Sequence, residues 1–384
     1  MLNSGQIKLR FIMVNVHRYI GLTVGFIFVL LGLTGSINVI HWELEEFSLP
    51  KVSSNQNYAP LDLDLLMKKL SIRHPHRNGK WVLYMPGYGR EYLWAIYPNP
   101  EEFSNKQFMP LRVLIDPHTG KIMEEHFWGQ TVCTFIYQLH ATLLTARFFD
   151  VEISRRMFKF VCGLGLPIAL LILTGLLMVK PRFLRSKSLA LAPYNIRLLS
   201  AVYALHTFVG IFSATILFVV AITGASFAYH DYIVPVFSFF SKDIANQVDS
   251  PNNPSSGPSL GRKKISISDA LALADQVFPN GELRWLETPV NSNGVYVVGK
   301  KQTGELNNRR PNSMVWIDQY SGEVLGVEDP NQYSTSQSFL ALIAPLHSGD
   351  AFGIFGRTLW FLTGLAPLIL YTTGIIIWRQ KVKD

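Results

Sequence analysis

The sequence predicts a membrane protein with an all-α four-helix transmembrane bundle, made of two pseudo-repeated helix pairs, and two small external α+β domains. Hydrophobic residues make up 48% of the 384 residues and charged residues only 16%, a low charged fraction for a soluble chain. Four apolar stretches reach the length of about 20 residues that a bilayer requires, at 19–40, 158–179, 207–229 and 358–378. A repeated residue pattern within the first and third stretches also supports this prediction, because it indicates two related helix pairs.

The repeat places two histidines and a series of small residues at identical offsets. The first copy carries His17, Gly21, Gly25, Gly32, Gly35 and His41, and the second carries His206, Gly210, Ala214, Ala221, Gly224 and His230. Small residues in a single membrane helix commonly permit helix–helix contact. Ionisable residues in membranes are scarce and usually functional, so two copies of the whole pattern indicate a repeated cofactor site, with haem as the natural candidate.

Basic residues predict the orientation of the chain in the membrane. They precede the first helix, fill the connection between the second and third helices without an acidic residue, and follow the fourth helix. By the positive-inside rule, both termini and this connection are cytoplasmic, and the two long connections lie outside. The net charge of +8 is attributed to this topology and to contact with the lipid bilayer. No nucleic-acid partner is expected.

Each long external connection has the pattern of a small α+β domain. Helical spacing over 61–74 and over 268–278 stops at a proline, and strand-like runs follow near 80–85, 91–97, 111–115, 283–288, 294–300 and 313–317. Each connection then carries an Asp-x-x-Thr/Ser-Gly turn, at 116–120 and at 318–322. The glycine stands where a hairpin turn needs a positive φ.

The expected domain boundaries follow from these patterns. In order along the chain they are the N-terminal segment and first helix in 1–45, the first external domain in 46–128, an interfacial helix with the second membrane helix in 129–182, a cytoplasmic loop with the third helix in 183–240, a linker with the second external domain in 241–337, and the fourth helix with a cytoplasmic tail in 338–384.

Depth in the bilayer divides six histidines near predicted helix ends into candidate pairs of haem ligands. One pair stands at the inner side, and two pairs compete for the outer side. In that order the pairs are His17 with His206, His140 with His347, and His41 with His230. The chain has no C-x-x-C-H attachment motif, so we expect haem b, two groups in all, each ligated by two histidines.

Helix geometry favours the first of the two outer pairs. At about 100° per residue in a straight helix, Gly35 lies on the face of His17, whereas His41 lies about 120° from it. A flat macrocycle packs closely only against small residues. The outer haem is therefore expected to lie against Gly35 and Gly224, and the pair that includes His41 remains the competing choice. The acidic residues that follow the outer histidines, Glu43, Glu45, Glu46 and Asp231, are interpreted as solvated helix ends.

These residues resemble the PepSY-associated transmembrane proteins over nearly the whole chain. Residues 17–22 with 33–35 are similar to the first segment of that family, and Leu139-His140, Leu205-His206 with Thr223-Gly224, and Leu346-His347 are similar to the remaining segments. The two external domains resemble PepSY domains. Carried over residue by residue, the resemblance implies four haem-iron ligands: His17, His140, His206 and His347.

The resemblance also implies a function in iron uptake. Some family members are ferric-siderophore reductases with b haems, so we expect a bacterial inner-membrane oxidoreductase that passes electrons across the bilayer to Fe(III) in a ferric siderophore on the periplasmic side. The chain has no G-x-G-x-x-G motif after a strand. Electrons would therefore come from a membrane quinol or a cytoplasmic reductase.

Two other functions stay open at this point. One is a haem-free PepSY sensor or peptidase-regulating membrane protein, and the other is a general quinol-linked haem electron carrier. The residue pattern names no catalytic side chain.

Overall fold

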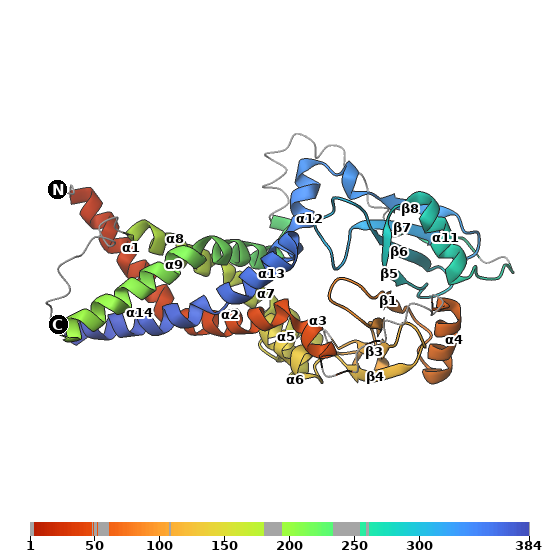
Figure 1. The fold of residues 1–384 in the computed structure, drawn as a ribbon, viewed down its shortest axis with the longest axis horizontal. Coiled ribbons are helices and arrows are strands. Elements are labelled where there is room, and N and C mark those ends of the chain that lie inside the picture. The colour runs from red at the N-terminus through yellow and green to blue at the C-terminus, as the bar shows by residue number, and fades with distance from the viewer. Residues whose placement is uncertain are drawn as a thin grey trace.

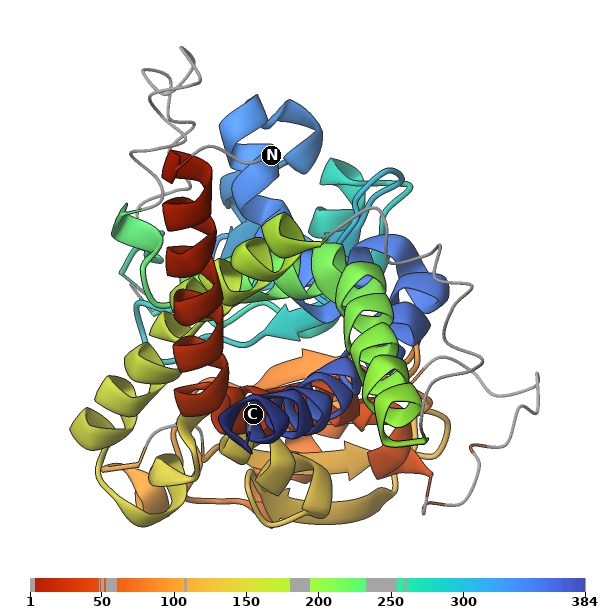
Figure 2. The ribbon, with the colours of Figure 1, turned by 90° about the vertical axis from the view of Figure 1, so that its left-hand side faces the viewer.

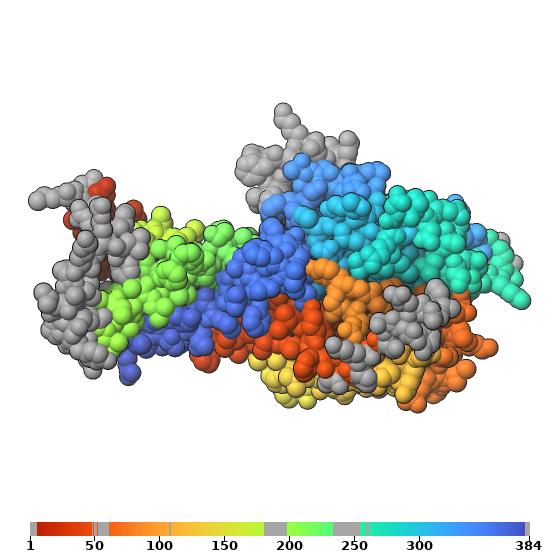
Figure 3. All heavy atoms as spheres, in the orientation of Figure 1, coloured from red at the N-terminus to blue at the C-terminus, as the bar shows by residue number. Residues whose placement is uncertain are grey.

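The computed structural model describes residues 4–47, 49, 52, 61–106, 109–179, 194–232, 254–258 and 261–383. The molecule is elongated (Figures 1 and 3), with a bundle of helices at one end and a β-sheet with its helices at the other (Figure 1). Both ends of the chain lie at the end of the bundle that is remote from the sheet (Figure 1). Figure 2 shows the helices from that end.

The helices of the bundle come from four parts of the chain. They are α1 (Ser4–Thr23), α2 (Gly25–Val39) and α3 (His41–Glu46); α5 (Val132–Thr142), α6 (Thr145–Phe148), α7 (Val151–Gly163) and α8 (Gly165–Met178); α9 (Tyr194–Ser226); and α12 (Thr335–Ser348), α13 (Gly353–Thr363) and α14 (Ala366–Lys383). The extra helical stretch expected near 129–149 is present as α5 and α6.

Three stretches of helix in the described part of the chain are long and apolar enough to cross a membrane. They are Val151–Met178, Leu198–Ser226 and Asp350–Gln380, and a fourth span results if the bent pair Gln6–Thr23 and Gly25–Val39 is counted as one. These spans correspond to the four apolar stretches of the sequence. The prediction of a multi-pass membrane protein is therefore confirmed at this level.

The first span is bent by 62° between α1 and α2. Close packing against α2 follows the bend: a Cβ added at Gly25 would stand 2.7 Å from the ring of Tyr371, and one at Gly32 would stand 2.6 Å from the carbonyl oxygen of Gly364. Neighbouring helices therefore approach α2 at positions that only glycine can occupy without displacement. The prediction of a straight first helix, and with it the shared face of His17 and Gly35, is wrong.

The two long connections between the spans form one antiparallel sheet of eight strands in the order β4-β3-β2-β1-β5-β6-β7-β8. The first connection supplies β1 (Val82–Tyr84), β2 (Leu93–Tyr97), β3 (Leu111–Ile115) and β4 (Ile122–Phe127), and the second supplies β5 (Glu282–Glu287), β6 (Val295–Lys301), β7 (Ser313–Asp318) and β8 (Val324–Glu328). The halves join where β1 pairs with β5, with Leu83 opposite Leu286. The sequence patterns had indicated two separate domains and had missed β4 and β8.

One hydrophobic core serves both halves of the sheet. Helices α4 (Leu63–Arg73) and α11 (Ile267–Val277) lie on the face away from the bundle (Figure 1), and their apolar side chains share a core with strands of both halves. Asp64 of α4 also caps α11, because its Oδ1 accepts a hydrogen bond of 2.7 Å from the backbone N–H of Ile267. The halves are therefore joined by strand pairing, by the core and by this cap.

The two predicted turns are confirmed. Asp116 Oδ1 accepts hydrogen bonds from the backbone N–H groups of residues 118 and 119, and Asp318 Oδ1 does the same for residues 320 and 321. Gly120 and Gly322 have φ angles of +64° and +73°, which side-chain-bearing residues rarely adopt. Each turn leads into the outermost strand of its half.

Candidate functional site

The structure brings four of the predicted histidines together in two pairs. In the inner pair, the rings of His17 on α1 and His206 on α9 have centroids 6.4 Å apart and planes at 81°. In the outer pair, His140 on α5 and His347 on α12 also have ring centroids 6.4 Å apart, with planes at 57°. Segments far apart in the sequence thus place two imidazoles side by side at two levels of the bundle.

Each of the four rings is held in the same way, by a threonine on a facing helix. The Nδ1–Oγ1 distances are 3.3 Å for His17 and Thr174, 2.8 Å for His206 and Thr373, 3.0 Å for His140 and Thr34, and 3.1 Å for His347 and Thr223. In two sites the carbonyl three residues before the threonine faces the same nitrogen, that of Leu171 at 3.0 Å and that of Val220 at 3.1 Å. The corresponding carbonyls of Leu31 and Leu370 also contact the rings of His140 and His206. We call each threonine with this carbonyl a fork.

The glycine after each threonine makes room for the imidazole. A Cβ added at Gly175, Gly224, Gly35 or Gly374 would stand 3.0, 3.1, 3.2 or 3.6 Å from the Cε1 atom of the histidine in that fork. The first three distances are shorter than ordinary contact, so a larger residue would displace the ring. Gly35 and Gly224, which were expected to border a macrocycle, lie against the rings of His140 and His347. Their contact with haem itself stays a prediction.

An inner cavity of about 560 Å³ lies between the helices at the inner pair. Its size is in the range of ligand pockets, roughly 300–1,000 Å³. Besides the two histidines, the small or basic residues that line it are Arg10, Arg18, Gly21, Gly25, Gly175, Gly210, Ala214 and Gly374. Most of the other lining residues are apolar. The cavity therefore offers space, two facing imidazoles and basic side chains in one place.

This donor set fits haem. The hydrogen bonds engage Nδ1 of each ring, so Nε2 is the ring nitrogen left to bind a metal. Two metal–imidazole bonds of about 2.0–2.1 Å each, together with the radii of two rings, span a distance close to the observed centroid separation of 6.4 Å. Within the described residues no group of three or more His, Cys, Asp or Glu side chains could hold a bare metal ion. A metal bound by one of these pairs would take its other ligands from outside the chain, as an iron held by the four nitrogens of a porphyrin does.

Not every small residue of the repeat belongs to the histidine sites. A Cβ added at Gly165 of α8 would collide with the carbonyl oxygen of Ala221 on α9, so Ala221 stands at a helix crossing, as Gly32 does. Gly21 and Gly210 line the inner cavity, and added Cβ atoms there would be 3.6 and 3.7 Å from leucine side chains. The series of small residues thus divides between helix packing and the cavity.

The competing outer histidines lie in unlike surroundings. His41 is 6% exposed, and its ring centroid is 4.6 Å from that of Trp42 and 6.5 Å from that of Trp128. Its Nδ1 donates a hydrogen bond of 2.7 Å to the carbonyl of Asn38. Burial, reinforced by the charge of Arg309, lowers the pKa of His41 to about 3. His230 is exposed, so the two residues do not form an equivalent pair.

Two of the acidic residues that follow His41 are not solvated helix ends. Glu45 accepts a hydrogen bond of 2.8 Å from Arg112 of β3, whose side chain is fully buried, and Glu46 accepts one of 2.6 Å from the indole N–H of Trp94. Burial raises the pKa of both carboxyl groups. The Arg112 guanidinium lies 3.7 Å from the centroid of the Trp94 ring. These contacts join α3 to the sheet, and the solvated interpretation is wrong for them.

A buried arginine at the outer end was not identified from the sequence. Arg357 of α13 is 3% exposed and donates a hydrogen bond of 2.7 Å to the carbonyl of Val39, the last residue of α2. Its guanidinium also lies 2.5 Å from Glu43. The arginine satisfies a carbonyl at the end of a helix and joins it to α13. Asp231, the remaining acidic residue, is exposed.

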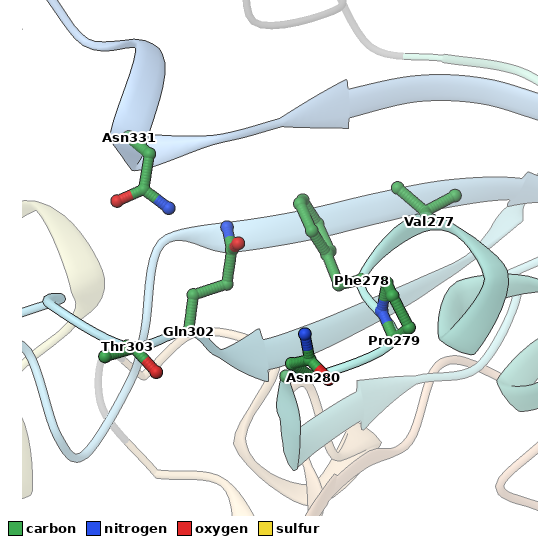
Figure 4. Close-up of a pocket in the computed structure, with 8 residues that line it drawn as sticks. Val277, Phe278, Pro279, Asn280, Gln302, Thr303 and Asn331 are labelled. Atoms are coloured by element: carbon green, nitrogen blue, oxygen red, sulfur yellow. The ribbon is translucent and has the colours of Figure 1, made fainter.

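A smaller cavity of about 230 Å³ lies at the sheet end of the molecule, after α11. Figure 4 shows the neutral side chains around it, which include Asn280, Gln302 and Asn331. The residues that line it lie on other elements than those that carry the histidine pairs, and none of these lining residues is titratable. The chemistry that the sequence indicates is therefore concentrated at the two pairs.

The role of the four fork threonines was not predicted from the sequence. A Thr-Gly doublet occurs in each of the four apolar stretches, at 34–35, 174–175, 223–224 and 373–374. Its recurrence was visible in the sequence, but its role was not, because each doublet faces a histidine that is more than 100 residues away in the chain.

Comparison with known families agrees with this architecture. Residues 14–381 match the family described as the PepSY-associated TM region. The match covers the helices of both histidine pairs and the whole sheet, so the chain belongs to this family. No curated protein matches the chain.

Proposed function

We propose that this protein is a di-haem b oxidoreductase of the bacterial inner membrane that reduces Fe(III) in ferric siderophores on the periplasmic side. The observation that carries the proposal is the fork, which occurs four times and holds two pairs of imidazoles with centroids 6.4 Å apart. A bundle that needed only helix packing would not require four half-buried histidines held alike, since ionisable groups in membranes are costly.

The residues of each site have distinct tasks. His17 and His206 would hold the inner haem, and His140 and His347 the outer haem, through Nε2. Arg10 and Arg18 line the inner cavity, where a guanidinium can pair with a carboxylate of the ligand. Bound there, haem supplies one-electron transfer between Fe(III) and Fe(II), and ligation by two histidines leaves no open position for oxygen chemistry.

The arrangement of the chain supports a direction for the electrons. The basic ends lie at one end of the bundle and the sheet at the other (Figure 1), which by the positive-inside rule supports a periplasmic position for the sheet. A membrane quinol or a cytoplasmic reductase would supply electrons near the inner pair. Oxygen chelators hold Fe(II) much more weakly than Fe(III), so reduction beside the sheet would aid iron release.

Haem content is the first test. We expect the purified full-length protein to show the reduced-minus-oxidised spectrum of haem b with two haems per chain. His17→Ala should retain one haem, and the exposed His230 provides the matched control, because His230→Ala should retain two. Purified protein that binds no haem when haem is supplied would contradict the proposal and favour the haem-free sensor.

Electron transfer to iron is the second test. Protein reduced with dithionite and freed of excess reductant should be reoxidised when a ferric siderophore is added, and a ferrous-iron indicator should report one Fe(II) per haem oxidised. The gallium(III) complex of the same siderophore has the same charge and shape but cannot be reduced, so it should have no effect. Reoxidation by quinones alone would instead identify a general quinol-linked carrier.

A further inference from the structure

We infer that Thr34, Thr174, Thr223 and Thr373 are positioning residues that hold the four histidines in the Nδ1–H tautomer and thereby preset Nε2 as the ligand nitrogen. The consequence for haem rests on the proposed function. The tautomer itself is a property of the chain and can be measured without haem.

The hydrogen bonds of one fork determine where its protons are. Thr223 Oγ1 donates to the carbonyl of Val219 at 2.7 Å, and a hydroxyl has only one proton to donate. Towards His347 Nδ1, at 3.1 Å, the hydroxyl can then only accept. The carbonyl of Val220, 3.1 Å from the same nitrogen, can also only accept. His347 Nδ1 must therefore carry the proton, and Nε2 has the free lone pair.

The same bonding occurs in the other three forks. The threonine hydroxyl donates to the carbonyl four residues earlier in each case: Thr34 to Leu30 at 2.7 Å, Thr174 to Leu170 at 2.8 Å, and Thr373 to Ile369 at 2.6 Å. Each therefore faces the histidine Nδ1 as an acceptor. Four independent repeats of one proton arrangement are hard to attribute to helix packing alone, because packing places no requirement on a tautomer.

The forks also connect specific helices. His17 is held by α8 and His140 by α2, so these two forks join the helices of the first half of the chain to one another. His206 is held by α14 and His347 by α9, within the second half. Each half thus carries its own two forks, and each histidine pair takes one ligand from each half. A change in one fork is expected to affect one ligand of one site.

The chemical consequence is a shift in the preferred oxidation state of the metal. A hydrogen bond accepted from Nδ1–H makes the ring a stronger donor and so favours Fe(III) over Fe(II). Removing the hydroxyl leaves only the carbonyl as acceptor. We expect about a tenfold loss of this preference, by analogy with the lower end of the roughly 10–100-fold effect that such outer residues have on metal affinity. For a one-electron couple a tenfold change corresponds to about +59 mV in midpoint potential.

The chain contains a matched control for the threonine substitutions. Thr372 is exposed and stands next to Thr373 on α14, and its hydroxyl donates to the carbonyls of Leu368 at 2.8 Å and Ile369 at 3.0 Å. It thus makes the back-bonds that are common for threonine in membrane helices without facing a histidine ring. Thr372→Val removes those bonds and nothing else that the inference uses.

The first experiment uses the haem-free full-length protein labelled with ¹⁵N-histidine. The nitrogen shifts of His347, identified by comparison with His347→Gln, should show the Nδ1–H tautomer. Thr223→Val should give a mixture of tautomers, whereas Thr223→Ser and Thr372→Val should keep the original pattern. An Nε2–H ring in the unchanged protein, or an Nδ1–H ring that persists fully in Thr223→Val, would overturn the inference.

The second experiment uses the haem-loaded protein and potentiometric titration. Thr223→Val should raise the midpoint potential of one haem by about 59 mV with two haems retained, and Thr223→Ser should restore it. Potentials that are equal in Thr223→Val, Thr223→Ser and Thr372→Val would show that the hydroxyl does not act on the ligand. If no haem binds, the proposed function fails, while the tautomer experiment still decides the inference.

Discussion

The two copies of the repeated helix have the same pattern of residues and different shapes. Residues 17–41 are divided among α1, α2 and α3 with a bend of 62° after α1. Residues 206–226 lie within α9, which runs without a break from Tyr194 to Ser226. In both copies, however, the first histidine and the Thr-Gly doublet make the same contacts to partners elsewhere.

The unit that recurs in both copies is therefore a contact between two helices and not one helix. In the first copy, His17 fits into the fork of α8, while Thr34 and Gly35 receive His140. The histidine and the doublet of one copy therefore belong to different sites. Because neither site needs both of them at a fixed angle, a bend between them changes no fork.

Haem content should change most when a ligand of the outer site is removed, and it distinguishes His140, which faces the doublet of the first copy, from His41 within that copy. His140→Ala should reduce the haem content from two to one per chain, because it removes an outer ligand. His41→Ala should retain two haems, since His41 faces Trp42 and Trp128. Haem-to-protein ratios of the purified variants measure both. If His41→Ala retained one haem and His140→Ala retained two, the ligands of the outer haem would be the competing pair that includes His41.

Haem affinity at the inner site should respond differently to substitution of the two glycines in its forks. An added Cβ would stand 3.0 Å from His17 at Gly175 but 3.6 Å from His206 at Gly374. Gly175→Ala should weaken haem binding at the inner site by about 1–3 kcal/mol, as overpacking does, whereas Gly374→Ala should leave it unchanged. Haem titration of both variants tests the contrast, and equal losses would show that the distances do not control the site.

The free energy of unfolding should depend on pH through His41 and not through His230. The folded pKa of His41, about 3, lies below its ordinary value of 6.5 because of burial, so the unfolded chain binds more protons between these values. Stability is therefore complete above pH 6.5 and falls as the pH falls towards 3, by about 2 kcal/mol at pH 5 from this residue.

Unfolding of the detergent-solubilised protein at pH 7.5 and pH 5 measures this loss. His41→Gln should lose less stability between the two pH values than the unchanged protein does. His230→Gln serves as the control and should follow the unchanged protein, because His230 is exposed. Identical curves for all three proteins would contradict the assigned burial of His41.

The smallest effect concerns the bend. Gly25 of α2 and Ala214 of α9 occupy the same offset in the two copies. Gly25→Ala should destabilise the protein by about 1 kcal/mol, the low end of overpacking, because the ring of Tyr371 can rotate away. Ala214→Gly should cost about 0.5–1 kcal/mol through helix propensity. Thermal unfolding measures both, and a stabilised Gly25→Ala variant would show that Tyr371 does not limit α2.

Much of the fold could be predicted because its signals are local. Twenty or so apolar residues identify a span, and an Asp with a Gly four residues later identifies each hairpin turn. The spans and both turns are confirmed in the described chain. β4 and β8 were missed, and β8 has exposed and half-buried residues only, so it lacks the alternation that marks a half-buried strand.

The apolar spans, the family and the histidines that the structure pairs could be identified from the chain alone, because composition and short motifs are local properties. How the two copies are used depends on the folded molecule: on the joining of the two long connections through β1 and β5, on the bend of the first span, and on the forks. All three arise from contacts between residues far apart in the chain, and the geometry of such contacts is set by packing against neighbours that no local pattern specifies.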